Sequence, residues 1–383
     1  MNNKKTAFGY IFNTLAIALI LFLFFNYQNN VTLAGGESFT FFSKKLVPNL
    51  WQCCYFIILV TSLNMVLGFL GQLSLGHCGF MAIGAYTAAL GSLAFQRAEI
   101  ITDEHPLYLL MTVGVILAGG LLSALVGFVV GIPALRLKGD YLAIITLGFG
   151  MIIVNIINNI PWCGDQGLAE GSASATLYKT GLSFSSKEKV VYSWLAIVIT
   201  LICVIMMFMF IRSKYGRAIK AIRDDEIAAS ASGLNVSFYK ILTFAYSAFF
   251  AGIAGGIYTC TIPSLSTSSF AFTNNGILNS IFIVVMVVVG GMGSLTGSIV
   301  SAVLMFFLNY YIKNVVDTSA FPVFIQNLFN YPMLVYAIAL IILIMFRPRG
   351  IFGTYEFSPT GIVYSIINKL KGIKPKKSEG GNK

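Results

Sequence analysis

The chain has 383 residues, of which 57% are hydrophobic and only 10% are charged, and its mean hydropathy is +0.82. Soluble domains carry roughly 25% charged residues, so this composition excludes an ordinary soluble protein. A net charge of +11 would suit a nucleic-acid partner in a soluble protein, but membrane proteins also gather basic residues on their cytoplasmic side. The sequence therefore predicts an all-α polytopic membrane protein that binds no nucleic acid.

In chain order, about ten apolar runs approach the ~20 residues that a membrane-spanning helix needs. They lie at 8–27, 49–70, 79–96, 106–133, 140–160, 192–211, 239–262, 277–293, 296–312 and 331–346. If these runs alternate across the bilayer, most of the Lys and Arg residues between them fall on one side, which the positive-inside rule makes cytoplasmic. Both termini are then predicted to be cytoplasmic. No small-residue cleavage site follows the first run, so we expect it to stay as a membrane anchor.

One transmembrane domain is predicted over residues 1–353, with a basic cytoplasmic tail at 354–383 close to anionic membrane lipid. The interval 161–191 is rich in Gly, Ser and Lys and has no apolar periodicity, so it is expected to be an external loop. The segment 212–238 falls on the cytoplasmic side.

Ionisable side chains are nearly absent from the predicted spans, although ion-coupled carriers and membrane enzymes keep such groups there for their function. The six Cys residues show no metal-ligand spacing, and no G-x-x-x-x-G-K-[ST] phosphate-binding loop occurs. We therefore expect no catalytic residues, metal or cofactor in this chain. If it moves a solute uphill, the energy must come from another subunit.

Glycine is dense at residues 71–79 and 290–297, and such density predicts unwound helix. Unwound backbone at membrane depth is tolerated where it lines a cavity, and a helix that restarts there points its N–H groups at the cavity, which suits a carboxylate. Simple helix crossing is the alternative reading, and a lone His in such a stretch is more often a packed residue. The candidate translocation-pathway residues are Gly71, Gln72, Ser74, Gly76, His77 and Gly293.

Three glycine pairs have four-residue spacing, and we interpret them as helix-packing positions. They are Gly127 with Gly131, Gly252 with Gly256, and Gly293 with Gly297.

The cytoplasmic segment between the sixth and seventh runs predicts two short helices. Its first part is amphipathic, with Ala218, Ala221 and Ile222 on one side and Arg217, Lys220 and Arg223 on the other. Asp224 or Asp225 can cap a second helix over residues 226–232, which Gly233 would end. Such a pair of helices is suited to docking, although a plain solvated loop would also satisfy the positive-inside rule.

At this point the sequence resembles a known family. Residues 226–233 match the E-x-A-A-x-x-x-G core of the cytoplasmic motif that docks ABC importer permeases on their ATPase subunits. The blocks 71–87, 133–150, 216–256, 290–297 and 346–353 look like the LivM-type permeases of branched-chain amino acid ABC transporters, in the same order. The resemblance implies the ABC importer permease fold. It assigns ATPase coupling to Arg223, Asp225, Glu226, Ala228, Ala229 and Gly233.

The resemblance also implies the function and the partners. The function would be translocation of leucine, isoleucine or valine across the bacterial inner membrane, driven by ATP hydrolysis on other subunits. The expected partners are a LivH-like second permease, two cytoplasmic ATP-binding subunits and an extracytoplasmic solute-binding protein. Two alternatives remain: a permease of a related urea or short-amide ABC importer, and a stand-alone channel, carrier or lipid-modifying enzyme.

Overall fold

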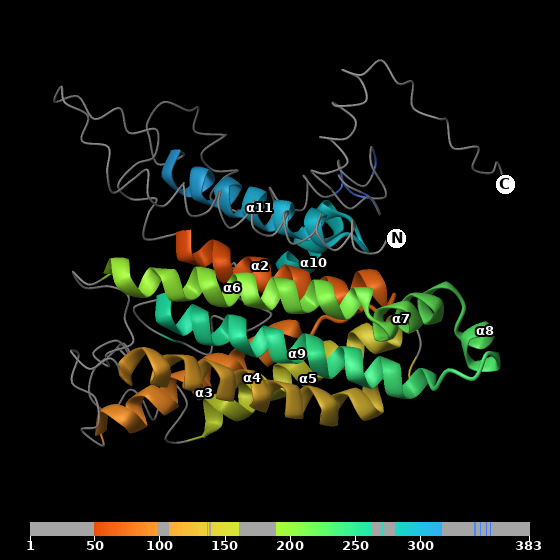
Figure 1. The fold of residues 1–383 in the computed structure, drawn as a ribbon, viewed down its shortest axis with the longest axis horizontal. Coiled ribbons are helices and arrows are strands. Elements are labelled where there is room, and N and C mark those ends of the chain that lie inside the picture. Colours follow the sequence, from red (N-terminus) through yellow and green to blue (C-terminus); the bar gives the residue numbers. More distant parts are fainter. Residues whose placement is uncertain are drawn as a thin grey trace, which may run out of the picture. The chain divides into compact units, whose positions relative to one another are not determined.

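The computed structural model describes residues 50–97, 107–135, 137, 139–160, 189–261, 265, 270, 280–315, 341, 345, 350 and 353. All of them belong to one of the two compact units of the chain, Phe39–Tyr355. Every regular element within these ranges is helical, as the sequence predicts (Figure 1).

Each predicted apolar run between residues 49 and 312 forms a helix. The elements are α2 (Leu50–Asn64), the π-helix η2 (Met65–Phe69), α3 (His77–Arg97), α4 (Leu107–Ala134), α5 (Asp140–Asn159), α6 (Lys189–Arg212), α7 (Lys214–Asp224), α8 (Glu226–Ala231), α9 (Val236–Thr261), α10 (Ser280–Gly290) and α11 (Leu295–Val315). The first predicted run, nearly all of the last one and the basic tail lie outside the described residues.

Five stretches of the described helices are long and apolar enough to cross a membrane, which supports a polytopic membrane protein. They lie in α2 with η2 and in α4, α5, α6 and α9, while α10 and α11 contain shorter apolar stretches. The sequence set the end of the external loop a little late, because residues 189–191 already belong to α6. The rest of that loop is not described.

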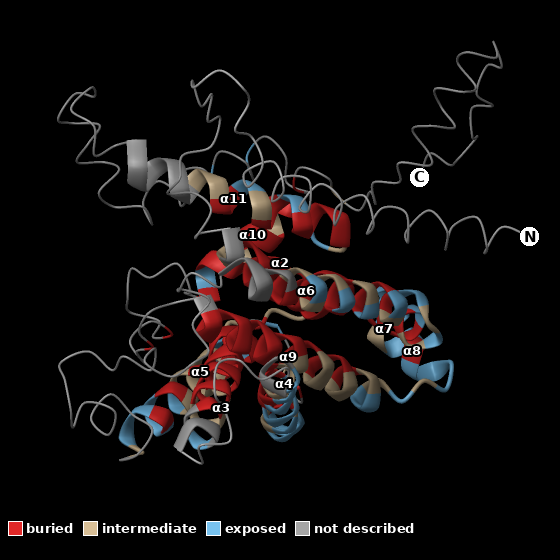
Figure 2. Cartoon of the chain, turned by 60° about the vertical axis from the view of Figure 1, so that its left-hand side comes forward, coloured by how far each residue is buried: buried red, intermediate tan, exposed pale blue. Residues whose placement is uncertain are grey.

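Helix α2 forms the core of this unit. It packs against α6, α9, α10 and α11, and its side chains from Cys53 to Leu63 are buried (Figure 2). By contrast, α4 keeps a row of exposed leucines that includes Leu117, Leu121 and Leu125. An apolar surface on a membrane-spanning helix suits lipid or a second membrane subunit.

Glycine and serine bring α3, α4 and α9 close together. A Cβ atom on Gly127 would lie 2.5 Å from the Cβ of Ala248, and one on Gly256 would lie 3.1 Å from Ile116. Ser123 Oγ lies 3.0 Å from the carbonyl oxygen of Phe80 and 2.8 Å from that of Ala248, so one hydroxyl joins all three helices. Helix packing is therefore the observed role of the glycine pairs on α4 and α9, as the spacing predicts.

Candidate functional site

The two glycine-rich stretches are breaks between helices, as predicted. The first break spans residues 70–76: it follows η2, has no regular structure from Gly71 onward, and ends where α3 begins at His77. The second break spans residues 291–294, between α10 and α11. Gly71 (φ +76°) and Gly293 (φ +93°) both have the left-handed backbone that L side chains rarely adopt, so each break depends on its glycine.

Asn64, at the end of α2, joins this helix to the second break. Its amide nitrogen donates to the carbonyl oxygen of Ser294 (2.9 Å) and to Ser298 Oγ (2.7 Å), and its amide oxygen accepts from the backbone N–H of Gly293 (3.0 Å). A Cβ atom on Gly68 would overlap the Gly293 backbone nitrogen, so η2 also lies directly against the second break. Segments more than 200 residues apart in the sequence therefore meet at one buried amide.

Arg223, the last basic residue of α7, reaches this junction from the connector. Its Nη1 donates a hydrogen bond to the carbonyl oxygen of Gly68 in η2. A Cβ atom on Gly71 would lie 3.0 Å from Arg223 Cγ, and one on Gly293 would lie 3.0 Å from its Nη1. One arginine of the predicted coupling segment therefore contacts both glycine breaks, together with the π-helix between α2 and the first break.

The connector folds as the sequence predicts, into two short helices at one end of α6 and α9 (Figure 1). The carboxylate of Asp225 caps α8, because its Oδ1 accepts from the backbone N–H groups of Ile227 (2.8 Å) and Ala228 (3.0 Å). Helix α8 ends at Ala231, and Gly233 follows with φ +86°. Asp225 rather than Asp224 is thus the cap.

One detail of the α7 prediction is wrong. Of the predicted apolar side, Ala218 and Ile222 are buried but Ala221 is exposed, and the buried face is completed by Gly216 and Ile219. At about 100° per residue, Ile219 and Ala221 lie at equal angles on opposite sides of Ala218 and Ile222. The helical pattern therefore does not choose between them, and the packing of α7 buries the side that carries Gly216 and Ile219.

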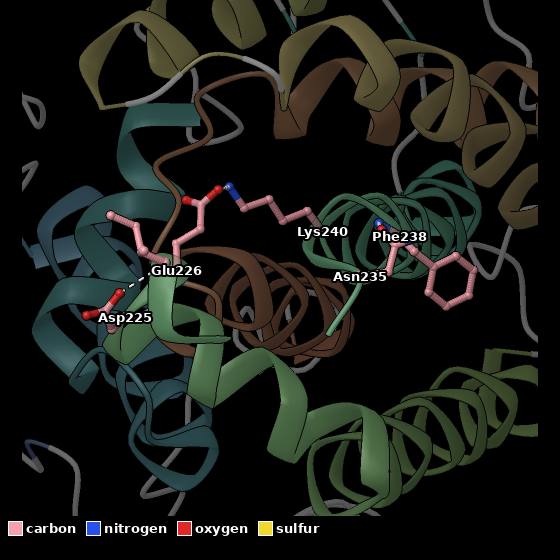
Figure 3. Close-up of polar contacts among 6 residues, drawn as sticks. Asp225, Glu226, Asn235, Phe238 and Lys240 are labelled. Carbon is pink, nitrogen blue, oxygen red and sulfur yellow. Dashed lines mark hydrogen bonds and ion pairs between the residues drawn. The ribbon is translucent and has the colours of Figure 1, made fainter. Parts of the chain in front are cut away.

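An ion pair attaches α8 to α9. Lys240 Nζ lies 2.9 Å from Glu226 Oε1, and the Lys240 side chain is only 6% exposed while that of Glu226 is 38% exposed. Figure 3 shows the lysine extending from α9 toward the Glu226 carboxylate, beside the cap residue Asp225. A buried ammonium group needs a compensating carboxylate, so this pair constrains where α8 begins. Sequence reasoning missed Lys240, because its buried environment appears only after folding.

The exposed side of α8 carries one large apolar side chain beside a small one. Ala228 is exposed, Ala229 is buried against the chain itself, and Ile227 is 78% exposed. An isoleucine this exposed on a connector is an available contact for another protein. The E-x-A-A motif allows any residue at position 227, so sequence reasoning did not select Ile227. The signal that could have identified it is a large apolar residue in the first turn after the cap.

The remaining pathway candidates separate into two environments. Gln72 faces a pocket beside the connector, whereas Gly76 packs so closely on α5 that a Cβ atom would overlap the Thr146 carbonyl oxygen. Ser74 is buried, and its hydroxyl finds no hydrogen-bond partner among the described residues. His77 is buried, with Nε2 2.8 Å from Ser62 Oγ, and this geometry agrees with a packed histidine.

Comparison with known proteins assigns the family. Residues 46–346 match the family described as the permease component of branched-chain amino acid transport systems, which is well over half of the chain. The chain belongs to this family of transport permeases. The match covers both glycine breaks, the connector and every described helix.

Individual relatives agree with the family assignment. The high-affinity branched-chain amino acid transport permease LivM of Salmonella typhimurium is 33% identical over 316 residues, which cover 77% of this chain and 67% of the relative. LivM of Escherichia coli is 32% identical with the same coverage. The ribose import permease RbsC of Haemophilus influenzae is 25% identical over 63% of this chain and 70% of its own length. No solved structure matches the chain.

Proposed function

We propose that this chain is a permease subunit of an ABC importer that carries leucine, isoleucine or valine across the bacterial inner membrane. The observation that supports this most directly is the family match over residues 46–346, together with the similarity to two LivM permeases over 77% of the chain. The weaker similarity to a ribose permease favours an amino acid over a sugar as the solute.

The proposed complex contains a LivH-like second permease, two cytoplasmic ATP-binding subunits and an extracytoplasmic solute-binding protein. This chain contributes about ten spans with both termini in the cytoplasm, and it has no catalytic residue or cofactor of its own. The near absence of ionisable groups from the predicted spans supports an energy source on other subunits rather than a coupling ion.

ATPase coupling is proposed for the connector residues Arg223, Asp225, Glu226, Ala228, Ala229 and Gly233. The geometry gives different roles to residues of this set and to Ile227 beside them. Ile227 and Ala228 are exposed and available for the ATPase, and Asp225 holds α8 in shape. Arg223 points the other way, toward the glycine breaks, so a movement of the connector would be passed to backbone that can change conformation.

The test is transport by the complete complex in proteoliposomes. We expect ATP-dependent uptake of leucine when the binding protein is present, and no uptake of urea or a short amide. Deletion of residues 226–233 is expected to abolish uptake and ATPase co-purification while the permease still inserts. Uptake of urea in place of leucine would support the alternative importer, and leucine transport by the purified chain alone would refute the proposed division among subunits.

A further inference from the structure

Helix α6 presents a row of exposed apolar side chains (Figure 2). The row consists of Val198, Ile202, Met206 and Met209, which are each 40% to 68% exposed. They lie three or four residues apart, so they share one face of the helix. Fewer than half of the residues in this span are buried, whereas 89% of those in the span of α2 are. A membrane-spanning face of this kind contacts lipid or another membrane subunit.

Positive charge follows directly at the end of this row. Arg212 ends α6 three residues after Met209, and Lys214 begins α7 two residues later, with both basic side chains exposed. The sequence has no Asp or Glu between Lys189 and Arg223. Lys214 pairs with no carboxylate in the part of the chain that the structure describes. An apolar row that ends in exposed cations is complementary to a lipid with an anionic headgroup.

A stack of aromatic rings fixes the position of the Lys214 ammonium group. The ring of Tyr215 lies parallel to that of Phe210, with centroids 6.1 Å apart, and Phe210 stacks on Tyr246 of α9 at 4.4 Å. The Tyr246 hydroxyl donates to the carbonyl oxygen of Met206 (3.3 Å), within the row itself. Lys214 Nζ lies 5.3 Å from the centre of the Tyr215 ring. Because tyrosines gather at the headgroup level of membranes, this cation is held where a lipid phosphate lies.

Two further cations of α7 are directed elsewhere. Lys220 Nζ lies 5.2 Å from the centre of the Phe69 ring in η2, and Arg223 donates to the carbonyl oxygen of Gly68. Both therefore contact η2 rather than the exposed row on α6. Lys220 has the same charge as Lys214 and belongs to the same helix, so it provides a matched control.

The geometry and the charge together identify one occupant. We propose that the end of α6 binds a phospholipid with an anionic headgroup, with an acyl chain along the exposed row and the phosphate beside Arg212 and Lys214. A second membrane subunit is the competing occupant of the row, but the cations at its end favour the lipid by charge complementarity. The inference goes beyond the proposed function, because it concerns a membrane lipid and not the solute. This lipid would lie where α6 passes into the connector.

The test uses the complete complex in phosphatidylcholine nanodiscs. Each sample contains a trace of phosphatidylglycerol or of phosphatidylcholine, with the same photoreactive acyl chains, and the cross-linked peptides are identified by mass spectrometry. We expect phosphatidylglycerol to label residues 195–212 at least about tenfold more than phosphatidylcholine does, because each nearby cation favours an anionic headgroup about fivefold. Lys214→Gln should lower this preference about fivefold, Arg212→Gln with Lys214→Gln should abolish it, and Lys220→Gln should leave it unchanged.

A competition experiment separates a lipid from a free anion. Millimolar inorganic phosphate or glycerol phosphate should not reduce the labelling, because neither has an acyl chain to cover the row. Displacement by either would make this an anion site and overturn the inference.

Three other outcomes would also overturn it. Equal labelling of the wild type by the two lipids would remove the headgroup preference, and a preference that survives in the double variant would place the lipid elsewhere. Cross-linking of Met209→Cys to a second membrane subunit would assign the row to that subunit. None of these outcomes affects leucine uptake, so the inference and the proposed function fail separately.

Discussion

At the scale of single residues, the ion pair between Glu226 and Lys240 is predicted to contribute to the free energy of unfolding. Glu226→Gln should cost about 1–2 kcal/mol, between the values for exposed and buried pairs, because the nearly buried ammonium of Lys240 loses its carboxylate. The double variant with Lys240→Met removes both charges and should recover most of that loss. Thermal unfolding of the purified protein in detergent measures both, and equal melting temperatures for the single and double variants would contradict this account.

Arg223 carries a different prediction, about coupling rather than stability. Arg223→Met keeps much of the stem beside Gly71 but removes the donor to the Gly68 carbonyl oxygen, a bond worth about 1.5 kcal/mol or roughly a tenfold effect. We expect the complex to assemble and hydrolyse ATP while leucine transported per ATP falls severalfold. Arg217→Met, at an exposed position of the same helix, is the matched control. Loss of ATPase co-purification in Arg223→Met would make Arg223 a docking residue instead.

At the scale of elements, the crossing of α3 and α9 depends on direct backbone contact. A Cβ atom on Gly84 of α3 would overlap the backbone of Gly252 on α9, so Gly84→Ala should destabilise the protein by about 2–3 kcal/mol. Gly114→Ala on α4 is the control, because nothing lies within 4 Å of the added methyl group and alanine favours a helix by up to about 1 kcal/mol. Melting temperatures should therefore move in opposite directions, and a shared direction would argue against the close approach.

At the scale of the whole molecule, the proposed topology places the connector and the tail on one side of the membrane and the interval 161–191 on the other. Ser232→Cys and Ser378→Cys should react with an impermeant maleimide in inside-out vesicles only, and Ser172→Cys only in right-side-out vesicles. The Cys residues in the described part of the chain are buried, and Cys163 in the interval 161–191 is replaced by Ser in every variant. Labelling of Ser232→Cys from outside would invert the topology and remove the basis for ATPase docking.

Local sequence patterns were enough to predict much of this protein. The described membrane helices, a capping aspartate at position 224 or 225 and the end of α8 before Gly233 depend on hydropathy, on a side chain bonded to its own next turn and on a residue that tolerates positive φ. Each of these is settled by residues within a few positions of one another, so the sequence alone determines them. The family resemblance is also local, because residues 226–233 and the flanking blocks can be identified from short stretches of sequence.

Only the tertiary structure decided which distant residues meet. Asn64 is hydrogen-bonded to Ser294 in the second break, 230 positions away in the sequence, and Arg223 is hydrogen-bonded to Gly68, 155 positions away. Lys240 becomes buried where it pairs with Glu226. The pocket beside the connector likewise combines side chains from segments that are far apart in the sequence. Contacts of this kind depend on how whole helices pack and on where glycine lets backbones approach, and no local pattern encodes the result.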